Sequence, residues 1–222
     1  FGFGGAALDG LALPGSSAGR FDNTLGGTRI DNSIKYTSAA VSGFQFNAMT
    51  GFGEVAGSSS AKQLWGIGAK YSQGPVYAGL SYQIQKCADK NGCTAATDND
   101  KLFAIGGSYD FGSAKLSAIF TRENNAKNVK GTDGDTAQVL VQVPVGKWLL
   151  GAGYQQLNDR SKLNQDVKQY NLSVLHYLSK RTTLYGVYSL QNVSNGGIAS
   201  MAMTNSSNNK QSAIALGIRH TF

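Results

Sequence analysis

Apolar side chains recur at every second position over eleven segments of the chain. In the last segment Ile214, Leu216 and Ile218 fall on one side, and the residues between them are alanine and glycine. Successive side chains of a β-strand point to opposite faces, so this period of two predicts strands. The predicted strands cover residues 28–38, 43–53, 62–72, 75–86, 101–111, 114–124, 135–143, 147–157, 167–178, 182–192 and 210–222.

The connections between these segments alternate strictly in length. The short ones are Ser38–Gly43, Ser72–Pro75, Phe111–Ser113, Pro144–Gly146 and Ser179–Arg181. The long, polar ones are residues 54–61, 87–100, 125–134, 158–166 and 193–209. An antiparallel meander in a membrane has this layout, with short periplasmic turns at one end and long external loops at the other. A Greek-key sandwich of similar length would mix its loop lengths and need crossing connections.

Most segments have one apolar face and one small or polar face. The apolar sets are Phe44/Phe46/Ala48, Trp65/Ile67/Ala69/Tyr71, Val76/Ala78/Leu80/Tyr82, Phe103/Ile105, Ala137/Val139/Val141 and Trp148/Leu150/Ala152/Tyr154. The opposite sets are Gln45/Asn47, Gly66/Gly68/Lys70, Gly79/Ser81/Gln83, Ser117/Thr121, Gln138/Gln142 and Gly151/Gly153/Gln155. Lipid suits the first sets and water suits the second. The sequence therefore predicts an all-β fold, a transmembrane antiparallel up-and-down β-barrel with a wet lumen. The faces of residues 182–192 stay unassigned, because apolar residues occur on both.

Aromatic residues gather where the strands approach the short turns. They are Tyr36, Tyr71, Tyr109, Phe111, Trp148 and Phe222. Aromatic side chains concentrate at membrane–water interfaces, so this grouping is typical of a girdle around a barrel. The ordinary preference of aromatic residues for strands is the alternative explanation.

Composition narrows the class of protein further. The 222 residues include 29 glycines and only 3 prolines, which favours many short strands and turns. No apolar run reaches the roughly twenty residues of a membrane-spanning helix, so helical insertion is excluded. The formal net charge of +7 predicts an anionic partner. Because the basic residues are scattered over the strands and not interleaved with stacking aromatics, we do not expect nucleic-acid binding.

The first residues resemble the inside of a loop. They read Phe1-Gly2-Phe3-Gly4-Gly5, without an initiator methionine or a basic and apolar leader. We therefore expect a chain that lacks N-terminal residues of a longer protein.

The two cysteines, Cys87 and Cys93, lie six positions apart in a polar loop. This spacing favours a disulfide in an oxidising compartment, with two free thiols as the alternative. The loop lacks further metal ligands, and Asp89-Lys90-Asn91-Gly92 misses the register of a calcium loop. We expect neither a metal site nor a cofactor.

Catalytic chemistry finds little support in the sequence. The only histidines, His176 and His220, lie on predicted strands without a nucleophile and base arranged nearby. The glycine pairs Gly66-x-Gly68 and Gly151-x-Gly153 lie inside strands, so neither is a phosphate loop. We therefore do not expect an enzyme.

Three segments of the chain carry a family resemblance, namely residues 28–36 (TRIDNSIKY), 178–185 (LSKRTTLY) and 217–222 (GIRHTF). They resemble the general trimeric porins of Gram-negative bacteria, in their β-proteobacterial branch. The likeness spans essentially the whole chain. Its most specific parts are the Arg-His-x-Phe ending and the Leu-Ser-Lys-Arg-Thr turn, since alternation alone would fit other outer-membrane barrels.

The resemblance implies a sixteen-stranded barrel in the outer membrane, of which the eleven segments are the last strands and about five are absent. Residues 1–27 would form the loop that folds into the pore and constricts it. Residues 28–222 would form barrel strands with short periplasmic turns and long extracellular loops. The final aromatic residue, Phe222, would act as the assembly signal, and the full-length parent would be a homotrimer surrounded by outer-membrane lipid.

The same resemblance implies which residues line the constriction. Arg29 matches the position from which the family projects an arginine across the pore, and arginine keeps its charge at any working pH. The alternative is an arginine solvated in the lumen away from the narrowest point. Asp9 would supply the opposing charge. Arg20 would lie where the loop rejoins the barrel, where it could instead pair locally with Asp22.

Basic residues outnumber acidic ones on the expected lumen face, with Asp110 as a partial counterweight. They are Lys35, Lys70, Lys115 and Arg219. Their summed charge predicts a preference for anions. We expect a general diffusion porin that passes inorganic ions and small hydrophilic solutes. The alternative is an adhesin or surface receptor that binds a host or phage partner through residues 87–100 and 193–209.

Overall fold

The computed structural model describes residues 30–89, 91–201 and 204–222. These residues form β-strands and one short 3-10 helix, η1 (Ala126–Asn128). In this described part, no helix has the length and apolar character needed to span a bilayer. The strands are β1 (Ser33–Thr37), β2 (Phe44–Gly51), β3 (Leu64–Gln73), β4 (Val76–Gln85), β5 (Asp100–Asp110), β6 (Lys115–Asn124), β7 (Gly134–Val145), β8 (Trp148–Asp159), β9 (Val167–Tyr177), β10 (Thr182–Val193), β11 (Ser200–Met201), β12 (Thr204–Asn205) and β13 (Lys210–His220).

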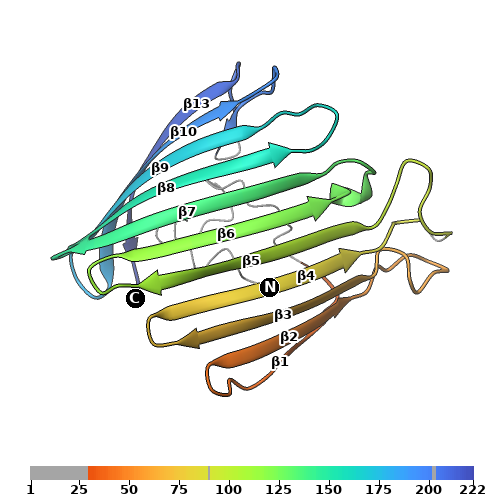
Figure 1. Ribbon diagram of the computed structural model, residues 1–222, viewed down its shortest axis with the longest axis horizontal. Coiled ribbons are helices and arrows are strands. Elements are labelled where there is room, and N and C mark those ends of the chain that lie inside the picture. Colours follow the sequence, from red (N-terminus) through yellow and green to blue (C-terminus); the bar gives the residue numbers. More distant parts are fainter. Residues whose placement is uncertain (1–29, 90, 202–203) are drawn as a thin grey trace.

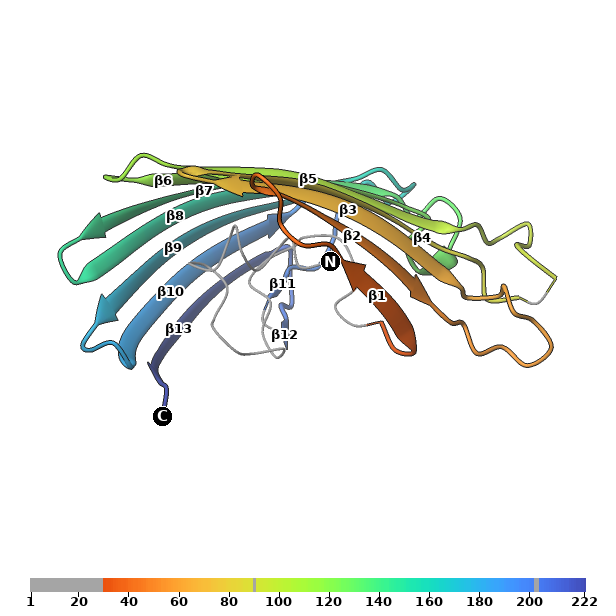
Figure 2. The ribbon, with the colours of Figure 1, turned by 90° about the horizontal axis from the view of Figure 1, so that it is seen from below.

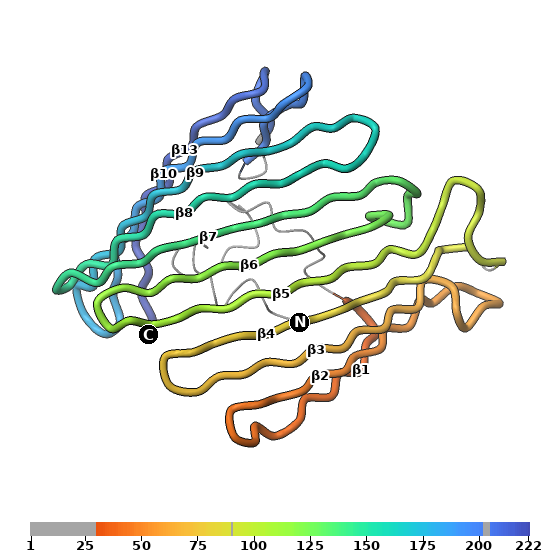
Figure 3. Tube along the Cα trace, viewed as in Figure 1, coloured from red at the N-terminus to blue at the C-terminus, as the bar shows by residue number. Residues whose placement is uncertain are grey.

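Eleven strands form one antiparallel sheet in the order of the chain, from β1 to β10 and then β13. The path of the chain is a continuous meander (Figures 1 and 3), with short turns at one end of the strands and long loops at the other. β10 pairs directly with β13, from Thr182 opposite His220 to Asn192 opposite Lys210. β1 and β13 are the two edges of this sheet. The predicted all-β, up-and-down antiparallel architecture is confirmed.

The sheet curves into a trough, and the small pair of strands β11 and β12 lies on its concave side (Figure 2). The Ser200 N–H donates a hydrogen bond to Oε1 of Gln191, and the Met201 N–H donates one to Oε1 of Gln211, both at 2.8 Å. Ala199 and Met201 are buried. The connection from β10 to β13, which the sequence predicted as a long external loop, is thus folded over the concave face.

The two faces of the sheet differ in polarity along each strand. On β7, Ala137, Val139 and Val141 are exposed, whereas Gln138 and Gln142 between them are buried. Exposed apolar residues continue along the same face of other strands, for example Ile67, Leu80, Ile105, Leu172, Ile214 and Leu216. The convex face is therefore the apolar one, and the concave face carries the polar side chains.

β10 supplies the face assignment that the sequence left open. Leu184 and Tyr188 are exposed on the convex face, while Val187 and Ser189 are buried on the concave face. The concave face is not purely polar, since Leu140 of β7 is also fully buried there. Alternation alone could not assign these strand faces, because an apolar residue on the inner side looks the same as one on the outer side.

The predicted strands match the observed ones to within a few residues, except at the beginning of the sheet. β1 starts at Ser33, not at the predicted residue 28. Asn32 has a φ of +48°, a left-handed conformation that does not continue a strand. The predicted loop 125–134 also contains η1, in which Lys127 has a φ of +56°.

Charged side chains mark the convex face near the long loops. Arg122 donates to both carboxylate oxygens of Asp135, at 2.8 and 2.9 Å. Arg160 Nε lies 3.3 Å from the same carboxylate and also donates to Oδ1 of Asn124 at 2.8 Å. Exposed pairs of this kind add little stability, so their main significance is their position. They show that the apolar face ends before the strands do.

Because the two faces differ in polarity, a charge introduced at two neighbouring positions of one strand should have unequal effects on stability. Leu216 is 80% exposed on the convex face of β13, and Ala215 lies on the concave face. Leu216→Arg is expected to destabilise the protein in lipid by about 2–4 kcal/mol, since charge on a lipid-facing position is costly. Ala215→Arg is expected to cost much less. Urea unfolding of protein reconstituted in liposomes measures both, and equal losses would contradict the assignment of the faces.

Candidate functional site: the concave face

A network of uncharged polar side chains lines the concave face of strands β7 to β10. Gln155 Nε2 donates to Oε1 of the neighbouring-strand residue Gln138 at 3.3 Å. Gln191 Nε2 donates to Oε1 of Gln169 at 2.9 Å, and Gln169 in turn donates to Asn171 at 3.0 Å. These side chains are buried and bond to one another across the strands. The network can hydrogen-bond polar molecules, but it has neither a nucleophile nor an acid–base pair.

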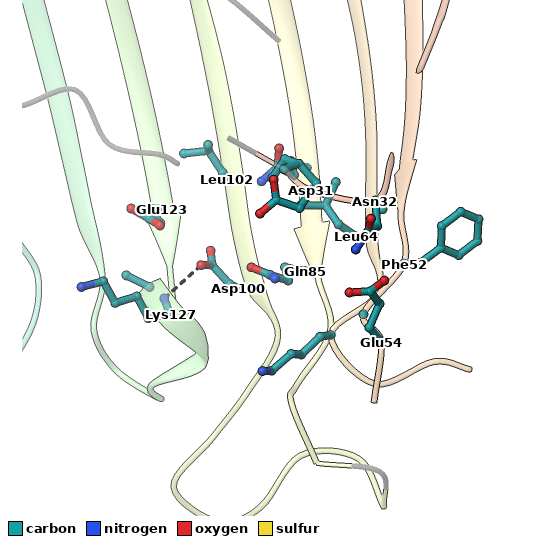
Figure 4. A pocket seen from close by; sticks show the side chains of 16 residues that line it. Asp31, Asn32, Phe52, Glu54, Leu64, Gln85, Asp100, Leu102, Glu123 and Lys127 are labelled. Atoms are coloured by element: carbon teal, nitrogen blue, oxygen red, sulfur yellow. Dashed lines mark hydrogen bonds between the residues drawn. The ribbon is translucent and has the colours of Figure 1, made fainter. Parts of the chain in front are cut away.

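A second zone lies at the long-loop end of the concave face, around a cavity of about 560 Å³. Figure 4 shows carboxylates from separate elements around it, including Asp31, Asp100 and Glu123. Glu54 also lines the cavity, together with the basic residues Lys62 and Lys127. Four acidic and two basic side chains make this end of the concave face net negative.

Hydrogen bonds between side chains and the backbone connect two long loops beside this acidic cavity. The Lys127 N–H donates to Oδ2 of Asp100 at 2.9 Å (Figure 4). Asn128 Nδ2 donates to the carbonyl oxygens of Gln85 and Asp98, both at 3.1 Å. Asn128 has a φ of +64°, a conformation that asparagine tolerates better than most residues. The loop after β6 is therefore fastened to the loop between β4 and β5.

The loop between β4 and β5 is closed by a disulfide between Cys87 and Cys93. The Cys87 N–H also donates to Oδ1 of Asn99 at 3.2 Å, and Cys87 is buried. The bond forms a small ring at the root of this loop. Asn99, the residue before Asp100, bonds to this ring through its side chain.

A third zone lies at the short-turn end of the concave face, around a cavity of about 740 Å³. Its charged lining residues are Lys147, Lys180, Arg181 and Arg219, and no acidic residue of the described chain lines it. The hydroxyl-bearing residues Tyr177, Ser179, Thr183 and Thr221 also line it. The two ends of the concave face thus carry opposite charge.

The structure places four predicted lumen residues on the concave face of the sheet. They are Lys35, Lys70, Lys115 and Arg219. Lys35 lies opposite buried Met49, and Lys115 lies opposite Gln142. Lys70 pairs across with Gln45 on one side and Gly79 on the other. Arg219 lines the basic cavity. The lysines are spread over several strands and do not form one cluster.

The other residues that the resemblance singled out lie elsewhere. Asp9, Arg20 and Arg29 fall outside the described residues, as does the predicted constriction loop 1–27. Phe222 follows the end of β13, and its ring lies 4.9 Å from the ring of His220.

Sequence reasoning missed the acidic cavity and most of the basic one. Glu123 could have been found, since it continues the period of Ser117 and Thr121 on the same strand. Lys147 and Arg181 could not, because they lie at or beside turns, where alternation assigns no face. Only the folded sheet brings these turns together with Arg219.

Comparison with known proteins places these features in a family context. The sequence model of a family described as Gram-negative porin matches residues 1–196. The chain is similar to outer membrane porin protein 32 of Delftia acidovorans, with 29% identity over 210 residues, and to an outer membrane porin protein of Bordetella pertussis, with 24% identity over 236 residues. These alignments cover 88% and 87% of this chain but 58% of each relative, so the chain spans less than two thirds of their length.

Solved structures show the same fold. The anion-selective porin from Comamonas acidovorans superposes with a TM-score of 0.74 and 23% identity, over 87% of this chain and 60% of that one. A loop L8 deletion mutant of OmpT, an outer membrane protein of Vibrio cholerae, superposes with a TM-score of 0.61 and 17% identity, over 91% and 70% of the two chains. At these identities, the likeness concerns the arrangement of strands.

The hairpin folded over the concave face yields a local prediction. Gln211→Ala removes the acceptor of the Met201 N–H, and a buried donor left unsatisfied costs about 1–3 kcal/mol. Amide exchange at Met201 is expected to accelerate by roughly 5–150-fold. Hydrogen–deuterium exchange with mass spectrometry measures it. Ser212→Ala, on the convex face of the same strand, is the control. Unchanged protection in Gln211→Ala would show that this bond does not hold the hairpin.

Proposed function

The chain belongs to the Gram-negative porin family, and on that premise we propose that it forms the wall of a general diffusion pore. Ions and small hydrophilic solutes would cross through the space enclosed by the concave face. The family and its relatives place the protein in the outer membrane. They are channels, so the protein is not an enzyme.

The observation that carries this proposal is the contrast between the two faces of one curved sheet. Leu216 and Leu172, at 80% and 57% exposure, present apolar surface on the convex side. Amides and hydroxyls occupy the concave side, where Gln155 and Gln169 bond to their neighbours. A wall with lipid on one side and water on the other requires this division. A passage lined by amides and hydroxyls selects by size and charge and not by a shaped pocket.

An anion preference is supported by the cations of the concave face. Lys35, Lys70 and Lys115 lie in the wall, and Arg219 lies in the basic cavity. The name of the structurally similar porin from Comamonas acidovorans describes it as anion-selective. The acidic cavity opposes this preference at the long-loop end. Lys70 and Lys115 lie near short turns, as Arg219 does, so the selectivity would be set toward the short-turn end of the pore.

The constriction is proposed from the sequence, because its residues lie outside the described part of the chain. Residues 1–27 would fold into the pore, with Arg29 and Asp9 on opposite walls of the narrowest zone. Arg20 would lie at the return of this loop. Such opposed charges would set up a transverse field through which small ions pass.

The full-length protein would be a homotrimer in lipid, as in the general porins that the chain resembles. A separate expectation concerns the two edge strands of the described sheet. Within the described part of the chain, β1 and β13 each pair with only one neighbouring strand. Unpaired backbone groups are costly in a bilayer, which lacks water to bond them. Both edges would therefore pair with further strands in the membrane.

Ion selectivity tests this function directly. Under a salt gradient in planar bilayers, protein purified from outer membranes is expected to show a reversal potential of anion-preferring sign. Lys35→Gln/Lys70→Gln/Lys115→Gln should lower the anion-to-cation permeability ratio by at least about twofold, since charges in water still interact by about 1 kcal/mol at contact. Arg29→Ser should act in the same direction.

The matched control for this experiment removes the same charge from the convex face. Lys101→Gln/Lys168→Gln/Lys210→Gln changes three cations that share a face with exposed apolar residues. Its reversal potential should equal that of the unmodified protein. Absence of any conductance in trimeric protein would refute the pore and favour a surface receptor.

Substitutions in the acidic cavity should change the anion-to-cation permeability ratio in the opposite direction. Asp100→Asn/Glu123→Gln removes two of the four carboxylates at the long-loop end. The anion-to-cation permeability ratio should rise by at least about twofold in the same assay, because a repulsive charge is removed from the path. An unchanged ratio would mean that ions do not pass this cavity.

A further inference from the structure

Four cations of the short-turn end line one cavity, to which the described chain contributes no acidic residue. Lys147 comes from the turn before β8, Lys180 and Arg181 from the turn before β10, and Arg219 from β13. The cavity they line has a volume of about 740 Å³. Neighbouring like charges repel one another, so this grouping weakens the folded state unless an anion occupies it.

Three other basic groups of the described chain have acidic neighbours. Arg122 and Arg160 share the carboxylate of Asp135 on the convex face. Lys127 lies beside Asp100 in the acidic cavity. Within the described part of the chain, none of the four cations at the short-turn end forms an ion pair. The basic cavity is therefore distinct from the surface pairs found elsewhere on this sheet.

The backbone holds three of these four residues in place. The Tyr177 N–H donates to the carbonyl oxygen of Lys147 at 2.9 Å, and the Thr221 N–H donates to that of Arg181 at 3.0 Å. Arg219 lies opposite Thr183 in the β10–β13 ladder. Because the main chain is already ordered around the cavity, little further ordering is needed when a ligand binds.

The Lys180–Arg181 turn has its own internal support. Ser179 Oγ accepts hydrogen bonds from the N–H groups of Arg181 and Thr182, both at 3.1 Å. Thr182 Oγ1 lies 2.9 Å from Nδ1 of His220, which ties the turn to the last strand. Thr183 and Thr221, which carry hydroxyl groups, line the cavity beside the cations. The site thus combines charged and neutral donors on a fixed frame.

We propose that this cavity is a binding subsite for divalent oxyanions of the sulfate and phosphate class. Guanidinium groups form paired hydrogen bonds with two oxygens of an oxyanion, and lysines add point charges. The cavity exceeds one such ion in size, so the ion binds partly hydrated. The inference rests on the proposed pore, since the ligand reaches the concave face through it. It adds a saturable site at the periplasmic mouth, where the short turns of outer-membrane barrels lie.

Sulfate tests the subsite, because it keeps two negative charges at neutral pH. Chloride current through protein purified from outer membranes is recorded in planar bilayers while sulfate is added to one side. Sulfate is expected to lower the current saturably, and at lower concentration from the short-turn side. Arg181→Gln/Arg219→Gln should raise the half-blocking concentration at least about tenfold, because hydrogen bonds to charged groups are strong ones.

A control and a second variant keep the test decisive. Lys168→Gln/Lys210→Gln removes two convex-face cations and should leave the block unchanged. Lys147→Gln/Lys180→Gln removes the two lysines of the same cavity. It should weaken the sulfate block, as the arginine variant does. A block that never saturates, or one that is equal in all variants, would overturn the subsite.

A binding measurement separates this proposal from the proposed pore. Isothermal titration of detergent-solubilised protein with sulfate does not depend on conductance. Saturable binding that is lost in Arg181→Gln/Arg219→Gln supports the subsite even if the bilayer shows no current. Anion-selective current without saturable sulfate binding would leave the pore standing and refute the subsite.

Discussion

The structure depends on one constraint, the pairing of every backbone N–H and C=O with a neighbouring strand. In lipid no water is available to replace a missing bond, so strands must join in a continuous ladder. Between its two edge strands, the described chain meets this requirement with a meander in which each strand bonds to the next, and β10 skips the small β11–β12 pair to bond β13. Once the ladder exists, alternation divides the side chains between two environments. The apolar convex face and the polar concave face both follow from it.

The charges along the concave face come from a different source than its polarity. The middle of the face is built by strands and is lined by uncharged groups such as Gln155 and Asn171. The two ends are built where connections meet, and there charge accumulates. Asp100 and Glu123 lie around the acidic cavity at the long-loop end, while Arg181 meets Arg219 at the other. A solute that moves along the concave face would therefore meet an acidic, a neutral and a basic zone in turn.

The strands could be predicted from the sequence because period two is a local signal that needs no knowledge of contacts. It failed where an apolar residue such as Val187 points inward, and at Asn32, where the backbone leaves the extended region. The folded-back β11–β12 hairpin could not be predicted, since the glutamines that hold it, Gln191 and Gln211, come from strands on either side of the loop. The basic cavity could not be predicted either, because its residues also come from separate parts of the chain. Arg219 was visible on a strand, but its partners lie in turns distant in sequence.

The most direct test of the account is whether the concave face is wet while the convex face is covered by lipid. Single cysteines at Ala213, Ile214, Ala215 and Leu216 of β13 sample both faces of one strand, and the native cysteines are joined in a disulfide. Reaction with a charged, membrane-impermeant thiol reagent is measured in reconstituted vesicles. The account predicts fast labelling at 213 and 215 and slow labelling at 214 and 216. Equal labelling at all four positions would contradict it.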